Sequence, residues 1–307
     1  MPRHASHSSK LALCCLLGSA LLPAGATAAP TAAIPGPENT VAVETFSNEH
    51  AKLNTADASP LDPGHYELEP SFAYTHSERS WDGGGHAHGR GLFREQRLAL
   101  SFLAGLVEDV DLNIKGGYSW LKDNDNDFDP NDGMAGPSRG ADFTDLDIKG
   151  RYRFYNNPQR HLAFAYIAGV TIPTGSDSDR DDIGTSQEYW SFNQTLALTK
   201  DWGRWTANGD IGYALPIGNK RANARGTLVT DLAVGYQVFH WLQPEVELNY
   251  SHDYLEGEDD AQTLAVTAGL LMPYNATWRV NIGVQQGIWG ENADKATKVL
   301  TAVKFAF

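Results

Sequence analysis

The chain has 307 residues, with 38 acidic against 24 basic side chains and a formal net charge of −14 at pH 7. An acidic chain of this kind is a poor candidate for binding nucleic acid. Hydrophobic residues make up 41% of the chain and the mean hydropathy is −0.38. Both values fit a soluble protein, and they also fit a membrane β-barrel, in which only every second strand residue faces lipid.

The N-terminus has the organisation of an export signal. Arg3 and Lys10 supply positive charge, residues 11–22 form a short apolar run, and small residues follow up to Ala28. The apolar run is too short to cross a bilayer as a helix. We therefore expect residues 1–28 to be a signal peptide that is cleaved after Ala28.

Cleavage at this position has consequences for the mature chain. The chain's two cysteines, Cys14 and Cys15, would leave with the signal, so no disulfide and no cysteine metal ligand is expected. Loss of two basic residues and no acidic ones leaves 22 basic and 38 acidic residues, a net charge of −16. The next segment, 29–62, is rich in Ala, Pro, Thr and Asn without a sustained period, which predicts a periplasmic segment. Whether it is a disordered linker or folds into a barrel lumen stays open.

From residue 63 onward, polar and apolar residues alternate with a period of two. Residues 145–154 show it without a slip: charged side chains and apolar, aromatic or glycine residues take turns. This alternation is typical of a strand with one polar face and one apolar face. The pattern predicts strands at 65–76, 93–106, 109–121, 143–155, 161–173, 187–200, 204–217, 227–239, 244–255, 262–272, 277–289 and 297–307.

The predicted connections alternate between short and long. Short links include 107–108, 201–203 and 273–276, whereas longer ones fall at 77–92, 122–142, 174–186, 218–226, 256–261 and 290–296. Outer-membrane barrels have short periplasmic turns and long external loops. We therefore predict an all-β fold over 63–307, a transmembrane antiparallel up-and-down β-barrel of about twelve strands, with ten or fourteen left open. This fold places the protein in the outer membrane of a Gram-negative cell.

The polar parity of the strands defines the expected lumen. The pore candidates are charged residues on this inward-facing set of positions, and five of them lie on the strand at 143–155. They are Asp145, Asp147, Lys149, Arg151, Arg153, Glu245, Glu247 and Arg279. Such charges either line a wet conduit or pair across strands and carry no solute, and the sequence leaves both open. The alternating C-terminal residues Val303, Phe305 and Phe307 resemble the signal read by the barrel-assembly machinery.

The sequence offers little for metals or catalysis. Asp123, Asp125, Asp127 and Asp129 have the spacing of a calcium loop, but Phe128 and Met134 replace the required glycine and glutamate. The His86 and His88 pair has no third ligand. No Gly-x-Ser-x-Gly motif occurs, and His252 has no evident catalytic partner. We therefore predict no metal, no cofactor and no enzymatic activity.

Two adjoining stretches carry a family resemblance. DFTDLDIKGRYRF (142–154) is followed by LAFAYIAGVTIPTGSD (162–177), a charged alternating strand and then an apolar strand that ends in Pro-Thr-Gly. Together they resemble the outer-membrane transporter-like family described as "putative MetA-pathway of phenol degradation". The resemblance covers about residues 63–307 and implies an outer-membrane barrel that passes small hydrophobic or aromatic compounds. It supplies no catalytic residues.

The function that we expect is passive transport of small, hydrophobic or aromatic molecules through an outer-membrane channel. The expected partners are outer-membrane lipid, lipopolysaccharide, the barrel-assembly machinery and a small hydrophobic solute. Two alternatives stay open: a non-transporting barrel for structure or surface adhesion, and a barrel lipid hydrolase.

Overall fold

The computed structural model describes residues 52–124, 138–178, 183–218, 223–275 and 277–307. Its strands are β1 (Tyr66–Trp81), β2 (Ala87–Val107), β3 (Val110–Asn124), β4 (Ser138–Phe143), β5 (Leu146–Asn157), β6 (Leu162–Ile172), β7 (Trp190–Trp202), β8 (Trp205–Ile217), β9 (Ala224–Tyr236), β10 (Gln243–Leu255), β11 (Ala261–Pro273), β12 (Trp278–Glu291) and β13 (Ala293–Ala306). Among these residues, no helix is long and apolar enough to cross a membrane.

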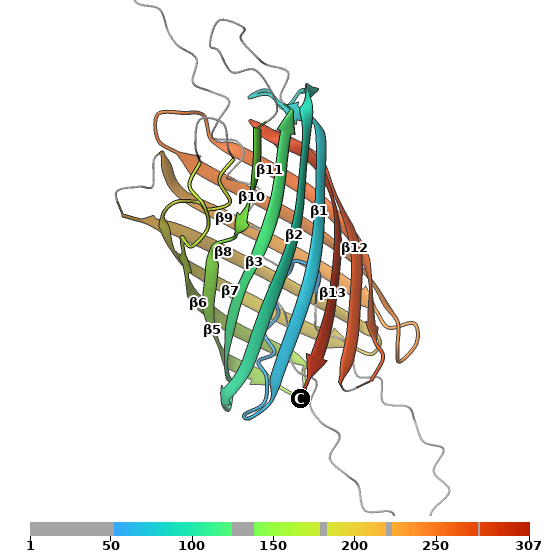
Figure 1. Cartoon of the computed structure of the whole chain (residues 1–307). Helices are drawn as coiled ribbons and strands as arrows, with labels where there is room; N and C mark the ends of the chain where they lie inside the picture. Colours follow the sequence, from blue (N-terminus) through green and yellow to red (C-terminus); the bar gives the residue numbers. More distant parts are fainter. Residues whose placement is uncertain (1–51, 125–137, 179–182, 219–222, 276) are drawn as a thin grey trace, which may run out of the picture.

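The strands form one closed antiparallel barrel (Figure 1). β1 pairs with β2 on one side and with β13 on the other, and β2 pairs with β3, so the sheet closes on itself. β4 and β5 both pair with β3, one after the other, and together occupy a single position in the wall. The barrel therefore has twelve strand positions, which confirms the predicted fold class.

The alternation of side chains matches the predicted parity. On β9, Leu232 and Val234 are 56% and 44% exposed, whereas Asp231 and Ala233, which alternate with them, are 5% and 1% exposed. On β8, Ile211 and Leu215 are likewise on the outside. This arrangement, with apolar side chains outside and polar ones inside, is the reverse of that in a soluble protein. It is the arrangement that a protein surrounded by lipid requires.

Aromatic side chains gather at the strand ends. Near the short turns, Trp278 meets Phe305 with ring centroids 4.0 Å apart, and Trp205 meets Tyr236 at 4.7 Å. At the opposite end, Tyr118 contacts Trp120 at 4.7 Å. Aromatic rings with a polar group prefer the interface between lipid and water, so the two groups mark the two rims.

Two predicted loops are largely strand. β1 continues to Trp81 and β2 begins at Ala87, within the predicted loop 77–92, and β12 and β13 are joined through Asn292 alone. Trp81, which is 4% exposed, explains the extension. A Cβ on Gly290 would lie 2.5 Å from its ring and one on Gly287 3.0 Å, so these glycines make room for it. The ring ties the protruding hairpin to β12.

Candidate functional site

The first part of the lumen, at the short-turn end, is filled by the segment that precedes β1. All ten residues from Lys52 to Leu61 are buried, and in Figure 1 this blue coil lies inside the barrel. The sequence left open whether this part of the chain is a linker or lies in the lumen. In the structure, residues 52–61 lie in the lumen. Residues 1–51 are outside the described ranges, so the boundaries of the signal peptide and of the 29–62 segment stay predictions.

Backbone N–H groups of this lumenal segment donate to side chains of the wall. Glu247 Oε1 on β10 accepts from the N–H of Leu53 at 3.0 Å and of Asn54 at 3.1 Å. Asp210 on β8 accepts from Ala56 at 2.7 Å. Further along, Ala58 donates to Thr199 on β7 at 2.9 Å and Leu61 to Asp111 on β3 at 2.9 Å. The acceptors come from strands around the barrel.

Ion pairs add to these hydrogen bonds. Lys52 Nζ lies 2.6 Å from Glu245 Oε2, and both side chains are fully buried. Arg151 on β5 donates from Nη1 to Asp57 Oδ1 at 2.6 Å and from Nη2 to Asp111 Oδ2 at 2.5 Å. One guanidinium thus joins the lumenal segment to β3. Arginine suits this role better than lysine because its planar group presents several N–H donors in fixed directions.

The second part of the lumen is a cavity of about 190 Å³ toward the long-loop end. Asn54 of the lumenal segment is among its lining residues, so the cavity reaches the segment. Its charged lining has both signs in equal number: Arg97, Lys115, Lys149, Lys298, Glu95, Asp145, Asp147 and Asp253. Small and apolar residues such as Ala73, Ala99 and Leu300 separate these charges.

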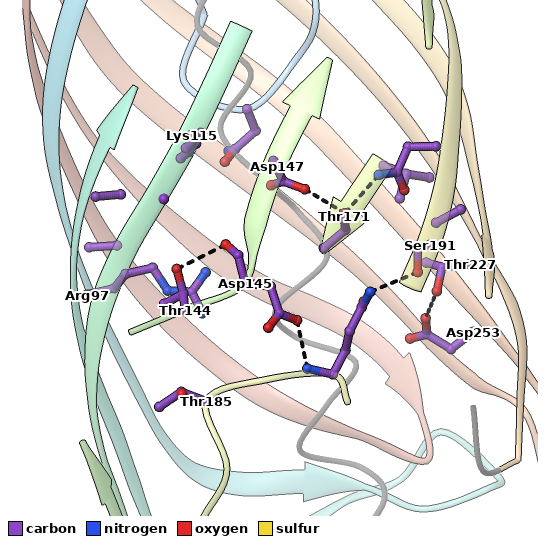
Figure 2. A pocket seen from close by; sticks show the side chains of 18 of the residues that line it. Arg97, Lys115, Thr144, Asp145, Asp147, Thr171, Thr185, Ser191, Thr227 and Asp253 are labelled. Atoms are coloured by element: carbon purple, nitrogen blue, oxygen red, sulfur yellow. Dashed lines mark hydrogen bonds between the residues drawn. The ribbon is translucent and has the colours of Figure 1, made fainter. Parts of the chain in front are cut away.

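The acidic groups of the cavity accept hydrogen bonds from neighbouring walls and loops (Figure 2). Asp147 accepts from the Thr171 hydroxyl at 2.6 Å, and Asp253 from the Thr227 hydroxyl at 2.5 Å. Glu95 Oε1 accepts from Arg97 Nε at 3.0 Å and forms an ion pair with Arg97 Nη2 at 2.8 Å. The carboxylates are therefore held against the wall, which keeps the cavity surface polar and fixed in shape.

Asp145 positions the connection between β6 and β7. Its two carboxylate oxygens accept from the N–H of Gly175 at 3.2 Å and of Gln187 at 2.8 Å, one near each end of that connection. Gln187 also donates to Ser191 at 2.9 Å. The connection therefore contributes Thr185, Gln187 and Tyr189 to the cavity lining.

The Pro-Thr-Gly motif has a packing role in the same place. Thr174 donates from its hydroxyl to the Thr144 carbonyl at 3.0 Å. A Cβ on Gly175 would lie 2.7 Å from the Phe143 carbonyl oxygen and 2.8 Å from Thr185 Oγ1. Glycine is needed because the chain passes this close to β4.

The predicted pore residues lie in four different places. Asp145, Asp147 and Lys149 line the cavity, whereas Arg151, Glu245 and Glu247 contact the lumenal segment. Arg279 is buried and lies 3.0 Å from Glu67. Arg153 lies at the short-turn rim, 2.5 Å from the half-exposed Asp109, away from both parts of the lumen. Their role in conduction stays a prediction.

The sequence left open whether the 29–62 segment enters the lumen, and it did not predict the glycines and alanines that accommodate residues 52–61. A signal was present, because Asp210, Asp231, Glu245 and Glu247 crowd acidic groups onto three adjacent inward faces. Buried carboxylates require donors, and the lumenal segment supplies N–H groups to Glu247 and Asp210 and a cation to Glu245.

Metal and hydrolase sites receive no support from the described residues. Within those ranges, no group of three or more His, Cys, Asp or Glu side chains is arranged to hold a metal ion. Of the calcium-like loop, Asp125, Asp127 and Asp129 lie outside the described residues. The hydrogen bonds that the structure describes for His252 go to Asp260 at 3.1 Å and Tyr250 at 3.4 Å, not to a serine.

Known structures share this architecture. An outer membrane channel from Pseudomonas putida F1 superposes with a TM-score of 0.68 at 14% identity, covering 82% of this chain and 98% of the other. Two monoaromatic hydrocarbon channels are more distant: CymD has a TM-score of 0.43 at 9% identity with coverages of 80% and 88%, and a TodX mutant has 0.43 at 9% with 81% and 91%. None of the curated proteins matches the sequence.

The sequence itself matches one family over residues 128–305, which is more than half of the chain. This stretch runs from the end of the β3 region to the last strand and includes the Asp145 site and most of the wall. The protein belongs to the family described as "Putative MetA-pathway of phenol degradation".

Proposed function

We propose that this protein is an outer-membrane channel for small, hydrophobic or aromatic molecules. The observation that carries the proposal is the cavity of about 190 Å³ inside a closed barrel with an apolar outer face. A cavity of roughly 150 Å³ is enough to hold benzene. The volume therefore suits a solute with a single ring.

The cavity lining supports a ring that carries a polar substituent. Hydroxyl groups of Thr144, Thr171 and Ser191 lie among apolar residues such as Leu300 and Val229. The formal charges of the lining sum to zero, so the lining has no excess of one sign that would favour an ion over a neutral solute. A small phenol combines the ring and the hydroxyl that this surface can accommodate, in agreement with the family description.

The proposal includes the location and partners of the barrel. The exposed apolar side chains would face outer-membrane lipid. The short turns would face the periplasm, and the long loops would contact lipopolysaccharide. The aromatic C-terminus, Phe305 and Phe307, would be read by the barrel-assembly machinery. A signal peptide would deliver the chain to the periplasm.

Uptake of a radiolabelled phenol tests the proposal. We expect uptake to fall in cells that lack the protein and to return with the wild type. Ala99→Trp places a large ring in the cavity and should abolish the recovery. Leu98→Trp is the matched control, because Leu98 is 50% exposed on the outer face. Equal uptake with and without the protein, at equal barrel abundance, would refute the channel.

The alternative is a barrel that passes nothing and serves the envelope or adhesion. The observation that favours it is the burial of residues 52–61 across the lumen. The uptake experiment separates the two functions, because a structural barrel would leave phenol uptake unchanged while its loss weakens the envelope against detergent.

A further inference from the structure

We infer that the short-turn half of the lumen is a built peptide-binding groove, that its ligand is residues 52–61 of the same chain, and that the bound segment closes the channel. The inference rests on the proposed channel function. It concerns the lumenal segment, Lys52–Leu61, and the wall side chains that contact it.

The wall is recessed where the lumenal segment needs space. Leu53 packs against Leu271 and Leu300, and a Cβ on Gly283 or Gly269 would lie 2.5 Å or 2.3 Å from Leu53 Cδ1. Both glycines therefore leave a recess that the leucine side chain fills. A Cβ on Gly105 would lie 2.0 Å from the Asp62 carbonyl oxygen, where the chain leaves the groove.

Small side chains continue the fit along the lumenal segment. Ala56 packs with Ile167 and Ala197, and Ala58 packs with Ala163 and Ala165. Alanine facing alanine brings the segment's backbone close to the wall. This close approach is what allows the backbone N–H groups to reach Asp210 and Thr199.

The chemistry of the groove is that of peptide recognition. Carboxylates of Glu247, Asp210 and Asp111 accept backbone N–H groups, which any extended peptide offers. The ion pairs of Lys52 with Glu245 and of Asp57 with Arg151 fix the direction and register of the lumenal segment. Backbone N–H groups that are buried inside a barrel need such acceptors, because an unpaired buried N–H is costly.

Closure follows from the path of the lumenal segment. Its contacts pass from β10 through β8 and β7 to β5 and β3, while Leu53 reaches β11 and β13. These strands lie on all sides of the lumen. A solute in the cavity would have to pass this segment to reach the periplasm.

A steric swap at the Leu53 recess tests the groove. Gly283→Leu fills the recess, so we expect the lumenal segment to be displaced and the open fraction in planar bilayers to rise about tenfold or more, from the lost burial of one leucine. Adding Leu53→Ala makes room for the new side chain and should restore closure. Gly150→Leu is the control, because a Cβ there has no neighbour nearer than 3.9 Å.

A covalent lock supplies a second measurement that does not depend on displacement. Ala58→Cys with Ala165→Cys joins two residues that are in contact. Oxidation should hold the channel closed, and reduction should return it to the behaviour of the unlocked chain. Each single-cysteine variant serves as the control for Cys14 and Cys15, should the signal remain.

The outcomes separate the two proposals. Conductance that is the same in wild type, Gly283→Leu and the oxidised double-cysteine variant would overturn closure by the lumenal segment and leave the channel intact. Folded barrel that conducts in no variant, including those that release the segment, would overturn the channel and closure together. Opening by Gly283→Leu that Leu53→Ala reverses supports both.

Discussion

Arg151 and Asp57 lie 94 residues apart in sequence, and their side chains are joined at 2.6 Å inside the barrel. The pair connects a strand of the wall to the segment that crosses the lumen. Asp57 is fully buried and Arg151 is 5% exposed. Removal of one partner from a buried ion pair is costly because the remaining charge stays uncompensated, by about 3–5 kcal/mol.

The first prediction follows from this pair. Arg151→Met should loosen the lumenal segment, because Asp57 and Asp111 both lose their cation. Hydrogen exchange at residues 52–61 should accelerate strongly. Arg153→Met is the matched control on the same strand: its partner Asp109 is 34% exposed, so the expected cost is only about 0–1 kcal/mol. Equal exchange in both variants would contradict the assigned role of Arg151.

The second prediction concerns the two faces of β9. Leu232→Arg puts a charge against lipid and should cost the barrel about 2–4 kcal/mol near mid-depth. Ala233→Arg instead enters the lumen directly opposite Glu247, the acceptor of the Leu53 and Asn54 N–H groups. We expect it to displace the lumenal segment while the barrel still folds. Heat-modifiability on gels measures folding, and a larger loss of folded barrel for Ala233→Arg would show that the facing is reversed.

The third prediction concerns barrel closure at the C-terminus. Phe307 and Tyr66 exchange backbone hydrogen bonds of 2.9 Å and 3.0 Å, and their rings stack at 5.9 Å. Deleting Phe307 removes the last contacts of the seam between β13 and β1, along with the expected assembly signal. Unfolded protein should then accumulate in the periplasm. Phe307→Tyr keeps ring and backbone and should assemble normally; normal assembly of the deletion would refute the prediction.

The fourth prediction is a pH effect in the loop between β10 and β11. Hydrogen bonds from the Leu255 N–H and then from His252 lower the pKa of Asp260. A lowered folded-state pKa means that the carboxylate stabilises the loop above its unfolded pKa, and that this contribution is lost as the pH falls through the folded-state value. The protection of the Leu255 amide, measured relative to its intrinsic exchange rate, should therefore fall at acid pH. In the Asp260→Asn variant, the Leu255 amide should be weakly protected at every pH. If the protection of this amide in the wild type does not change with pH, the assignment is contradicted.

The wall was predictable because lipid imposes the alternation. Outward positions that face lipid are mostly apolar, so Leu232 and Val234 are recognisable beside Asp231 in sequence alone. The strand ends were less predictable. The hairpin that reaches Trp81 depends on the absence of side chains at Gly287 and Gly290 on another strand, and no local pattern records that contact.

The sequence left the lumenal segment as one of two alternatives for a related reason. Its N–H groups are satisfied by side chains such as Glu247 and Asp210 rather than by a neighbouring strand, so it has no strand or helix period. Its recess consists of glycines, which look in sequence like weak strand positions. The cavity residues, by contrast, followed from parity, as Asp145, Asp147 and Lys149 illustrate.

The tether between the lumenal segment and the wall is short: only residues 62–65 separate Leu61 from the start of β1. A ligand on a short flexible linker has an effective concentration on the order of millimolar at its own site. A groove with only millimolar affinity for the free peptide would thus still be occupied about half of the time. Openings should be brief and end by recapture, and added peptide should compete poorly with the attached copy.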